Sequence, residues 1–179
     1  MSILNWVLES GEALINEACV QLSNRVRDKR TFETEGSPYL TRFYLLRKSK
    51  PDADDEALNA PFSVYLHYFH RGDEDPELHN HPWGFSFSLI LTNGYFEERW
   101  VGSKIVKRVL RPGSINILRS SDFHRVDLRD PNKGAWTLFF AGKRVQDWGF
   151  WHPTIRTEYM PWRTFIKERE AHARRTLSN

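Results

Sequence analysis

The stretch Leu78-His79-Asn80-His81-Pro82-Trp83 organises the whole chain. Two histidines separated by one residue point to the same face if they lie on a strand, because successive side chains alternate. Their imidazoles could then bind one metal ion. Four of the seven histidines fall between positions 67 and 81. The sequence therefore predicts a metal site here, with a third ligand to be found elsewhere.

The segments around this stretch have the pattern of short strands. Aromatic and β-branched residues dominate 39–47 and 62–70, and Asn93-Gly94 is a strong signal for a tight hairpin. Further short strands are expected over 85–91, 95–101, 104–110, 114–118, 124–128 and 135–142. Many short strands at near-regular spacing favour a sandwich or barrel, and the lack of alternating helices argues against a parallel α/β fold.

Helical periodicity occurs at both ends of the chain. Apolar residues recur at three- and four-residue steps over 3–27, and a second helical pattern covers 158–176. We expect one domain, with an N-terminal helix over 1–30, a β-barrel over 31–155 and a C-terminal helix over 156–179. The acidic run within 52–56 is interpreted as a solvated loop rather than a calcium site, because it lacks the glycine that a tight calcium loop needs.

Composition and charge narrow the classes of protein. The 179 residues are 40% hydrophobic and 27% charged, which is ordinary for a globular protein, and a net charge of +3 is too small to indicate a nucleic-acid partner. A single cysteine excludes an internal disulfide. The start lacks the pattern of a secretory signal, and no apolar stretch is long enough to span a bilayer. We expect a cytoplasmic protein without a membrane partner.

The best candidate for the third ligand is His124. The turn Arg111-Pro112-Gly113 leads into a strand, a short loop follows, and His124 opens the next strand. In a β-barrel, a histidine that belongs to a distant hairpin can lie beside His79 and His81 in this way. Two alternatives to metal binding stay open. His79 and His81 could belong to a polar loop ahead of a strand, and His124 could lie at the end of a strand with its ring hydrogen-bonded to the backbone.

These segments resemble the two motifs of the cupin superfamily. The first motif has His-x-His before a strand and a glycine turn, and the second has Pro-Gly, a strand and a histidine after a tight loop; here they cover about residues 78–126. Tyr65-Leu66-His67, Gly94-Tyr95 and residues 135–150 extend the resemblance to a group of small bacterial and phage cupins without a settled activity. The resemblance implies an all-β, antiparallel double-stranded β-helix (jelly-roll) barrel with flanking helices. By position, His79, His81 and His124 match its metal-binding histidines.

The chain departs from the cupin pattern at one position. Metal-binding cupins commonly carry a glutamate a few residues after the second histidine, but residues 83–88 contain no carboxylate and Ser86 takes that place. A three-histidine site is therefore expected. Neutral imidazoles suit several divalent metals, and three protein ligands leave positions open for water or substrate. We expect a divalent ion, Fe(II) first, with Zn, Ni or Mn as alternatives.

Three further residues are candidates for catalysis: His67, Tyr95 and Ser86. His67 lies on the strand over 62–70 and could be a fourth ligand, a partner of a ligand, an acid/base group or a satisfied core histidine. Ser86 could face substrate or hold a water molecule, and Tyr95 could shape the pocket. The remaining histidines, His70, His152 and His172, are expected at the surface.

The leading hypothesis for function is a mononuclear metal enzyme acting on a small organic molecule. A three-histidine iron centre resembles the thiol dioxygenases and some ring- or diketone-cleaving cupins, which implies a dioxygenase-like oxidoreductase. The alternatives are a non-catalytic sensor module that binds a metal or small ligand, and a metal-assisted isomerase or lyase on a carbohydrate-like substrate. A homodimer is a further hypothesis, because antiparallel barrels have edges and broad faces that often pair.

Overall fold

The computed structural model describes residues 3–34, 36–46, 62–73 and 75–177, and two six-stranded sheets form its centre. The first sheet has the order β1 (Lys29–Thr34), β2 (Ser37–Leu46), β3 (Ser63–Phe69), β10 (Ala135–Ala141), β5 (Phe85–Ile90) and β8 (Ile115–Arg119). The second has the order β12 (Arg156–Pro161), β11 (Gly149–His152), β4 (Leu78–His79), β9 (His124–Leu128), β6 (Tyr95–Val101) and β7 (Lys104–Leu110). Helices α1 (Ile3–Arg25) and α2 (Trp162–Leu177) flank the strands.

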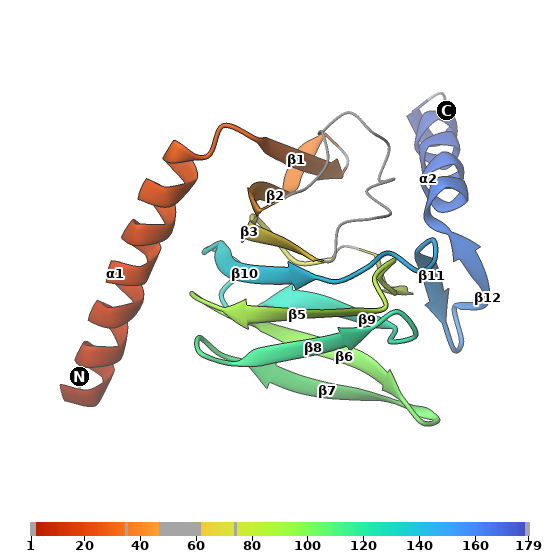
Figure 1. Ribbon diagram of the computed structural model, residues 1–179. Helices are drawn as coiled ribbons and strands as arrows, with labels where there is room; N and C mark the ends of the chain where they lie inside the picture. Colours follow the sequence, from red (N-terminus) through yellow and green to blue (C-terminus); the bar gives the residue numbers. More distant parts are fainter. Residues whose placement is uncertain (1–2, 35, 47–61, 74, 178–179) are drawn as a thin grey trace.

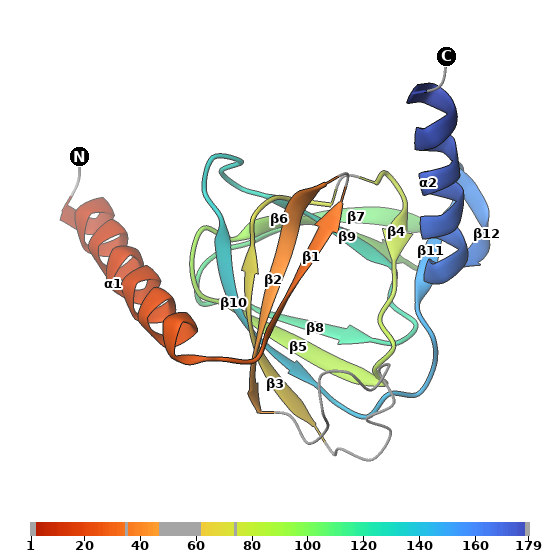
Figure 2. The same cartoon turned by 90° about the horizontal axis from the view of Figure 1, so that it is seen from above.

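Neighbouring strands in both sheets are antiparallel, and the sheets face each other across the interior of a barrel (Figures 1 and 2). Seen from above, the strands form a ring, with the two helices outside it (Figure 2). The predicted fold class, an antiparallel jelly-roll barrel with flanking helices, is confirmed. The strands that carry the candidate histidines, β4 and β9, are neighbours in the second sheet.

Alternation along β3 divides its side chains between the barrel interior and the outer face. Tyr65 points inward and packs with Phe139 and Ala141, whereas Leu66 points outward and packs with Cys19 of α1. The face of this sheet that points into the barrel therefore carries aromatic rings.

Helix α1 covers the first sheet only in part. Cys19 is 6% exposed, and the indole Nε1 of Trp136 donates a hydrogen bond to Oδ1 of Asn16 at 3.0 Å. Toward its N-terminal end α1 projects away from the barrel (Figure 1). Leu14 is 73% exposed, although Glu12 and Asn16 on either side of it both accept hydrogen bonds from barrel residues. The helix thus leaves apolar residues without a partner among the described residues.

The C-terminal helix begins later than the sequence suggested. Residues 156–161 form strand β12, which pairs with β11, and α2 starts at Trp162. Pro161 explains the difference, because the residue before a proline is disfavoured in the helical conformation. Phe165 of α2 then stacks on Phe150 of β11 with ring centroids 3.9 Å apart. The expected helix over 156–161 is therefore wrong.

Two other expectations concern the acidic run within 52–56 and a membrane-spanning segment. The acidic run within 52–56 lies outside the described residues. Neither α1 nor α2, the helices of the described part, combines the length and apolar character needed to cross a membrane.

Candidate metal centre

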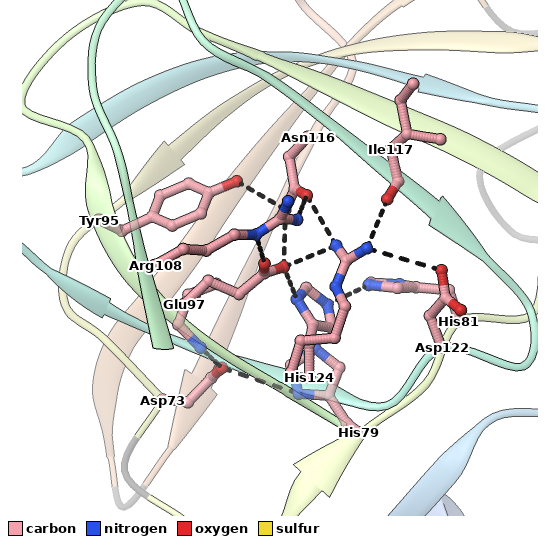
Figure 3. Close-up of polar contacts among 12 residues, drawn as sticks. Asp73, His79, His81, Tyr95, Glu97, Arg108, Asn116, Ile117, Asp122 and His124 are labelled. Carbon is pink, nitrogen blue, oxygen red and sulfur yellow. Dashed lines mark hydrogen bonds and ion pairs between the residues drawn. The ribbon is translucent and has the colours of Figure 1, made fainter. Parts of the chain in front are cut away.

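The three predicted ligands come together at one place in the barrel. His79 of β4 lies directly opposite His124 of β9 in the strand register, and His81 follows two residues after His79. One ring nitrogen from each histidine lies within 4.8 Å of the others, and Nε2 of His81 is 2.8 Å from Nε2 of His124 (Figure 3). Sequence reasoning therefore identified a real cluster of imidazoles.

Asn80, the residue between the paired histidines, fixes the backbone of this segment. Its side chain points to the opposite side, where Oδ1 accepts from the backbone N–H of Gly149 at 2.9 Å and Nδ2 donates to the carbonyl of Ser120 at 3.1 Å. Asn80 is only 5% exposed, so both hydrogen bonds are sheltered from water. The amide of Asn80 thus connects β4 to β11 and to the loop before β9, and this fixes His79 and His81 on the other side of the chain.

Glu97 lies directly behind His124. Nδ1 of His124 donates to Oε1 of Glu97 at 2.8 Å, which leaves Nε2 of His124 directed toward the other two histidines (Figure 3). Carboxylates that accept from the outer nitrogen of a metal-binding histidine fix its tautomer and raise its basicity. Glu97 is completely buried.

The charge of Glu97 is balanced by two arginines and an amide. Arg99 and Asn116 donate to its Oε1 at 2.8 and 2.9 Å, and Arg108 donates to Oε2. Burial by itself would raise the pKa of Glu97, but the hydrogen bond with His124 and the two guanidinium groups hold that pKa well below its usual range. Glu97 is therefore a stable anion inside the barrel.

Asp73 takes a similar place behind His79. Its Oδ2 lies 3.7 Å from Nδ1 of His79 and accepts from the backbone N–H of Val126 at 2.7 Å. Its Oδ1 accepts from the hydroxyl of Tyr39 at 2.5 Å. Two of the three histidines thus have a carboxylate on the side away from the cluster.

Two of the histidines, His79 and His81, are held neutral, which is the state that binds a metal. Burial lowers the pKa of His79 to about 4, although the charge of Asp73 opposes the shift. Burial, followed by the proximity of His124 and His79, holds the pKa of His81 well below its usual value. Nitrogens bound at about 2.1 Å to one ion lie about 3 Å apart at a right angle, close to the observed 2.8 Å. The His81 and His124 nitrogens are therefore spaced like two ligands of one ion, and the nitrogen of His79 lies within 4.8 Å of them.

His67 is buried beside the cluster but is not one of its three members. It is 3% exposed on the inner face of β3, with its ring stacked on Phe139 at 5.1 Å. Nε of Arg42 donates to Nε2 of His67 at 3.0 Å. Burial and the charge of Arg42 hold the pKa of His67 well below its usual value, so this ring is also neutral.

The other two candidates for catalysis lie inside the barrel. Ser86 is completely buried, and its Oγ has no hydrogen-bond partner among the described residues. Tyr95 is 3% exposed, and its hydroxyl accepts from Nδ2 of Asn116 at 3.3 Å. Burial raises the pKa of Tyr95 to about 12, so the phenol stays protonated. In Figure 3 Tyr95 is separated from the histidines by Asn116 and Glu97.

The histidines expected at the surface differ in exposure. His70 is exposed, with its Nε2 2.9 Å from the hydroxyl of Thr41. His152 is half-buried instead, because its Nδ1 accepts from the backbone N–H groups of Thr154 and Ile155 and closes a turn. The side chain of His172 lies outside the part of the chain that can be described.

Sequence reasoning missed the two carboxylates and Asn116. The window after the second histidine contains no carboxylate, and both acidic residues come from elsewhere: Asp73 from the segment between β3 and β4, and Glu97 from β6. A signal was present for Glu97, since strand alternation places it with Tyr95 and Arg99 on one face. Charged residues on the inner face of a barrel strand need buried partners, and these partners are histidines and arginines.

Comparisons with known proteins show no family. The chain matches no family model and no curated protein. Solved structures similar to it include Fe(II)-HppE with an alternative substrate, at 12% identity and a TM-score of 0.49, where the match covers 66% of this chain and 57% of the other. Recombinant oxalate oxidase in complex with glycolate matches at 16% identity and a TM-score of 0.41, over 50% and 46% of the two chains.

A third similar structure is a cupin-like protein from Thermotoga maritima, at 16% identity and a TM-score of 0.41, over 58% of this chain and 68% of the other. The chain thus spans little more than half the length of the HppE chain and less than half that of the oxalate oxidase. The fold and the chemistry of the site are therefore argued from the residues of this chain.

Proposed function

We propose that His79, His81 and His124 bind one divalent metal ion and that the chain is a mononuclear metal enzyme acting on a small organic molecule. The observation that supports this most is the convergence of three imidazoles, two of which have a carboxylate behind them. Fe(II) is the ion we propose first, with Zn, Ni or Mn as alternatives, because imidazole ligands do not discriminate strongly among these metals. A dioxygenase-like oxidation is the proposed reaction class.

When bound, such an ion supplies open coordination positions and Lewis-acid or redox chemistry. The chain's own contribution is to orient the ligands and exclude water. Glu97 and Asp73 orient two of the imidazoles, while Trp83 stacks on His81 at 5.8 Å and Phe139 lies 6.0 Å from it. A small molecule bound beside His81 would therefore meet an apolar, aromatic surface on one side and the metal ligands on the other.

The proposal is tested by metal analysis of purified protein and of three variants: His79→Ala, His81→Ala and His124→Ala. Wild type is expected to hold one ion per chain, and each variant to lose it, as measured by elemental analysis after reconstitution. His70→Ala is the matched control, because His70 is exposed and outside the cluster. Wild type that binds no Fe(II), Zn, Ni or Mn contradicts the proposal, and dioxygen uptake over a substrate panel tests the reaction class.

A sensor module is the second candidate function, and the exposed face of α1 favours it. Leu14, Ile15 and Leu22 are 73%, 41% and 41% exposed on a helix that contacts the barrel through Cys19. An apolar helix surface of this kind is suited to pass a ligand-dependent change to a partner. One bound ion per chain, without oxygen uptake or turnover of any substrate tested, would favour this function over the enzyme.

We also propose that two copies pair through the outer face of β5, β8 and β10. Phe85, Ile115 and Ile117 are 49%, 59% and 51% exposed there, and Phe87 stacks on Phe140 at 4.4 Å on the same face. Identical apolar faces can bury each other about a twofold axis. Sedimentation is expected to show a dimer that Ile117→Asp converts to monomer, and a monomeric wild type contradicts this pairing.

A further inference from the structure

Arg42 is a half-buried cation on the inner face of β2 that lacks a carboxylate partner among the described residues. It lies on β2 opposite His67 of β3 and, like His67, faces the interior. Within the described residues Arg42 forms no ion pair, and its one hydrogen bond runs from Nε to the neutral ring of His67. The two terminal nitrogens of the guanidinium, NH1 and NH2, therefore have no protein acceptor there. Since an arginine has five N–H donors, most of its binding capacity is unused.

Aromatic rings hold this guanidinium in place. Its central carbon lies 4.7 Å from the ring centroid of Tyr65, 5.1 Å from that of Phe32 and 5.7 Å from that of Trp83. Stacking on aromatic faces stabilises a guanidinium without consuming its hydrogen bonds. The hydrogen bond from Nε to His67 also fixes the direction of the fork, so NH1 and NH2 are presented end-on.

Arg42 is close to the histidine cluster. Trp83 lies under the guanidinium and also stacks on His81, with 5.8 Å between the two ring centroids. The positive charge of Arg42 is one of the causes that lower the pKa of His81. Arg42 and Trp83 are both half-buried, so part of each side chain is exposed to solvent.

We propose that Arg42 binds the acidic group of the substrate, an oxyanion such as a carboxylate or phosphonate, and positions the rest of the molecule against Trp83 and the histidine cluster. A planar guanidinium matches the two oxygens of such a group in a bidentate arrangement. This inference rests on the proposed function only in taking the bound molecule to be the substrate of the metal centre. The anion site itself is built from Arg42, His67 and three aromatic rings, none of which belongs to the proposed ligand set.

Calorimetric titration with lactate, methylphosphonate and lactamide tests the proposal, each added to metal-free and to cobalt-loaded protein. At least one of the two acids is expected to bind, and the uncharged lactamide to bind more weakly. Arg42→Gln is expected to weaken binding of that acid about 10- to 100-fold, the range for losing a charged hydrogen-bonded pair. Comparing lactate with methylphosphonate identifies which oxyanion the fork prefers.

Two further variants serve as controls. Arg163→Gln removes the same charge from an exposed residue of α2, whose guanidinium carbon lies 5.2 Å from the ring centroid of Trp162, and it should change affinity less than threefold. Arg42→Lys keeps the charge but not the fork, so its affinity should fall between wild type and Arg42→Gln. If circular dichroism shows that Arg42→Gln is misfolded, the acid affinity of wild type is compared with that of Arg42→Lys instead.

The outcomes separate this inference from the proposed function. Acid binding that depends on Arg42 in metal-free protein supports the anion site even where no metal binds. Metal binding at the histidines with no acid bound, or with equal acid affinity in wild type, Arg42→Gln and Arg42→Lys, overturns the anion site and leaves the metal centre standing.

Discussion

His124 and His67 are both almost completely buried, at 4% and 3% exposed, yet their partners carry opposite charges. Nδ1 of His124 donates to the carboxylate of Glu97, which leaves the lone pair of Nε2 free to bind a metal. Nε2 of His67 accepts from the guanidinium of Arg42, which occupies the corresponding lone pair. Burial alone therefore does not identify a metal-binding histidine, because the partner of the ring decides which nitrogen is available.

The same contrast divides the surroundings of the cluster into two sides. On the carboxylate side, Glu97 and Asp73 lie behind His124 and His79. On the aromatic side, Trp83 and Phe139 pack against His81, and beyond them lie His67 and Arg42. We infer that the carboxylate side holds the ligands in place, while the aromatic side receives the substrate.

Replacing Glu97 is expected to have the largest effect, because it removes the anion from a buried network. In Glu97→Gln, Arg99, Arg108 and His124 lose their shared acceptor charge, and breaking a buried pair of this kind costs about 3–5 kcal/mol. Metal affinity should fall about 10- to 100-fold, the usual effect of losing an outer partner of a metal-binding histidine. Denaturant unfolding of metal-free protein and chelator competition measure the two effects.

Glu98→Gln is the matched control for this prediction. Glu98 is the next residue on β6 and pairs with the exposed Lys107 at 2.6 Å, so its loss should cost less than about 1 kcal/mol. Equal destabilisation by the two variants would show that the network around Glu97 has no special role.

Lowering the pH should reduce the free energy of unfolding in two pH ranges, one set by the buried histidines and one set by Glu97. The unfolded state protonates histidine below its ordinary pKa of 6.5, but the folded state resists because the pKa of His67 is well below that value. The free energy of unfolding of metal-free protein should therefore fall as pH decreases below 6.5, by up to about 1.4 kcal/mol per pH unit for each such histidine. For His79 the loss should end near its folded pKa of about 4.

Glu97 acts in a more acidic range. Its folded pKa lies below the ordinary 4.5, so its stabilising contribution is present above pH 4.5 and is lost as pH falls further. His67→Gln should flatten the dependence between pH 6.5 and 4.5, whereas Glu97→Gln should flatten it below 4.5. Denaturant titrations at a series of pH values test this, and an unchanged slope in His67→Gln between 6.5 and 4.5 would refute the assignment.

The sequence predicted the barrel and the three histidines because both rest on local patterns. Strand alternation and the Asn93-Gly94 hairpin are readable over a few residues, and His79-x-His81 places two rings on one face by the same rule. The second motif then supplies His124 at the start of a strand. These features need no knowledge of which strands are neighbours.

The partners of the histidines were not predictable in the same way, because they depend on long-range pairing. Glu97 meets His124 because β6 pairs with β9, and Asp73 meets His79 because a turn hydrogen-bonds to Val126. Arg42 meets His67 through the register of β2 with β3. Strand β4 has only two residues, too few to show a period, and Pro161 is the local signal against a helix over β12.

Replacing Asp73 is expected to have the smallest effect and to rank the two carboxylates. Its Oδ2 is 3.7 Å from Nδ1 of His79, beyond ordinary hydrogen-bond length, whereas Glu97 is 2.8 Å from His124. Asp73→Asn should therefore weaken metal binding less than about tenfold and less than Glu97→Gln does, measured by the same chelator competition. Tyr39→Phe removes the phenol that donates to Asp73 but keeps the charge, and should change the affinity less than twofold. A loss in Asp73→Asn as large as that in Glu97→Gln would mean that His79 moves into hydrogen-bond contact with Asp73 when the ion binds, so that both carboxylates hold the ligands equally.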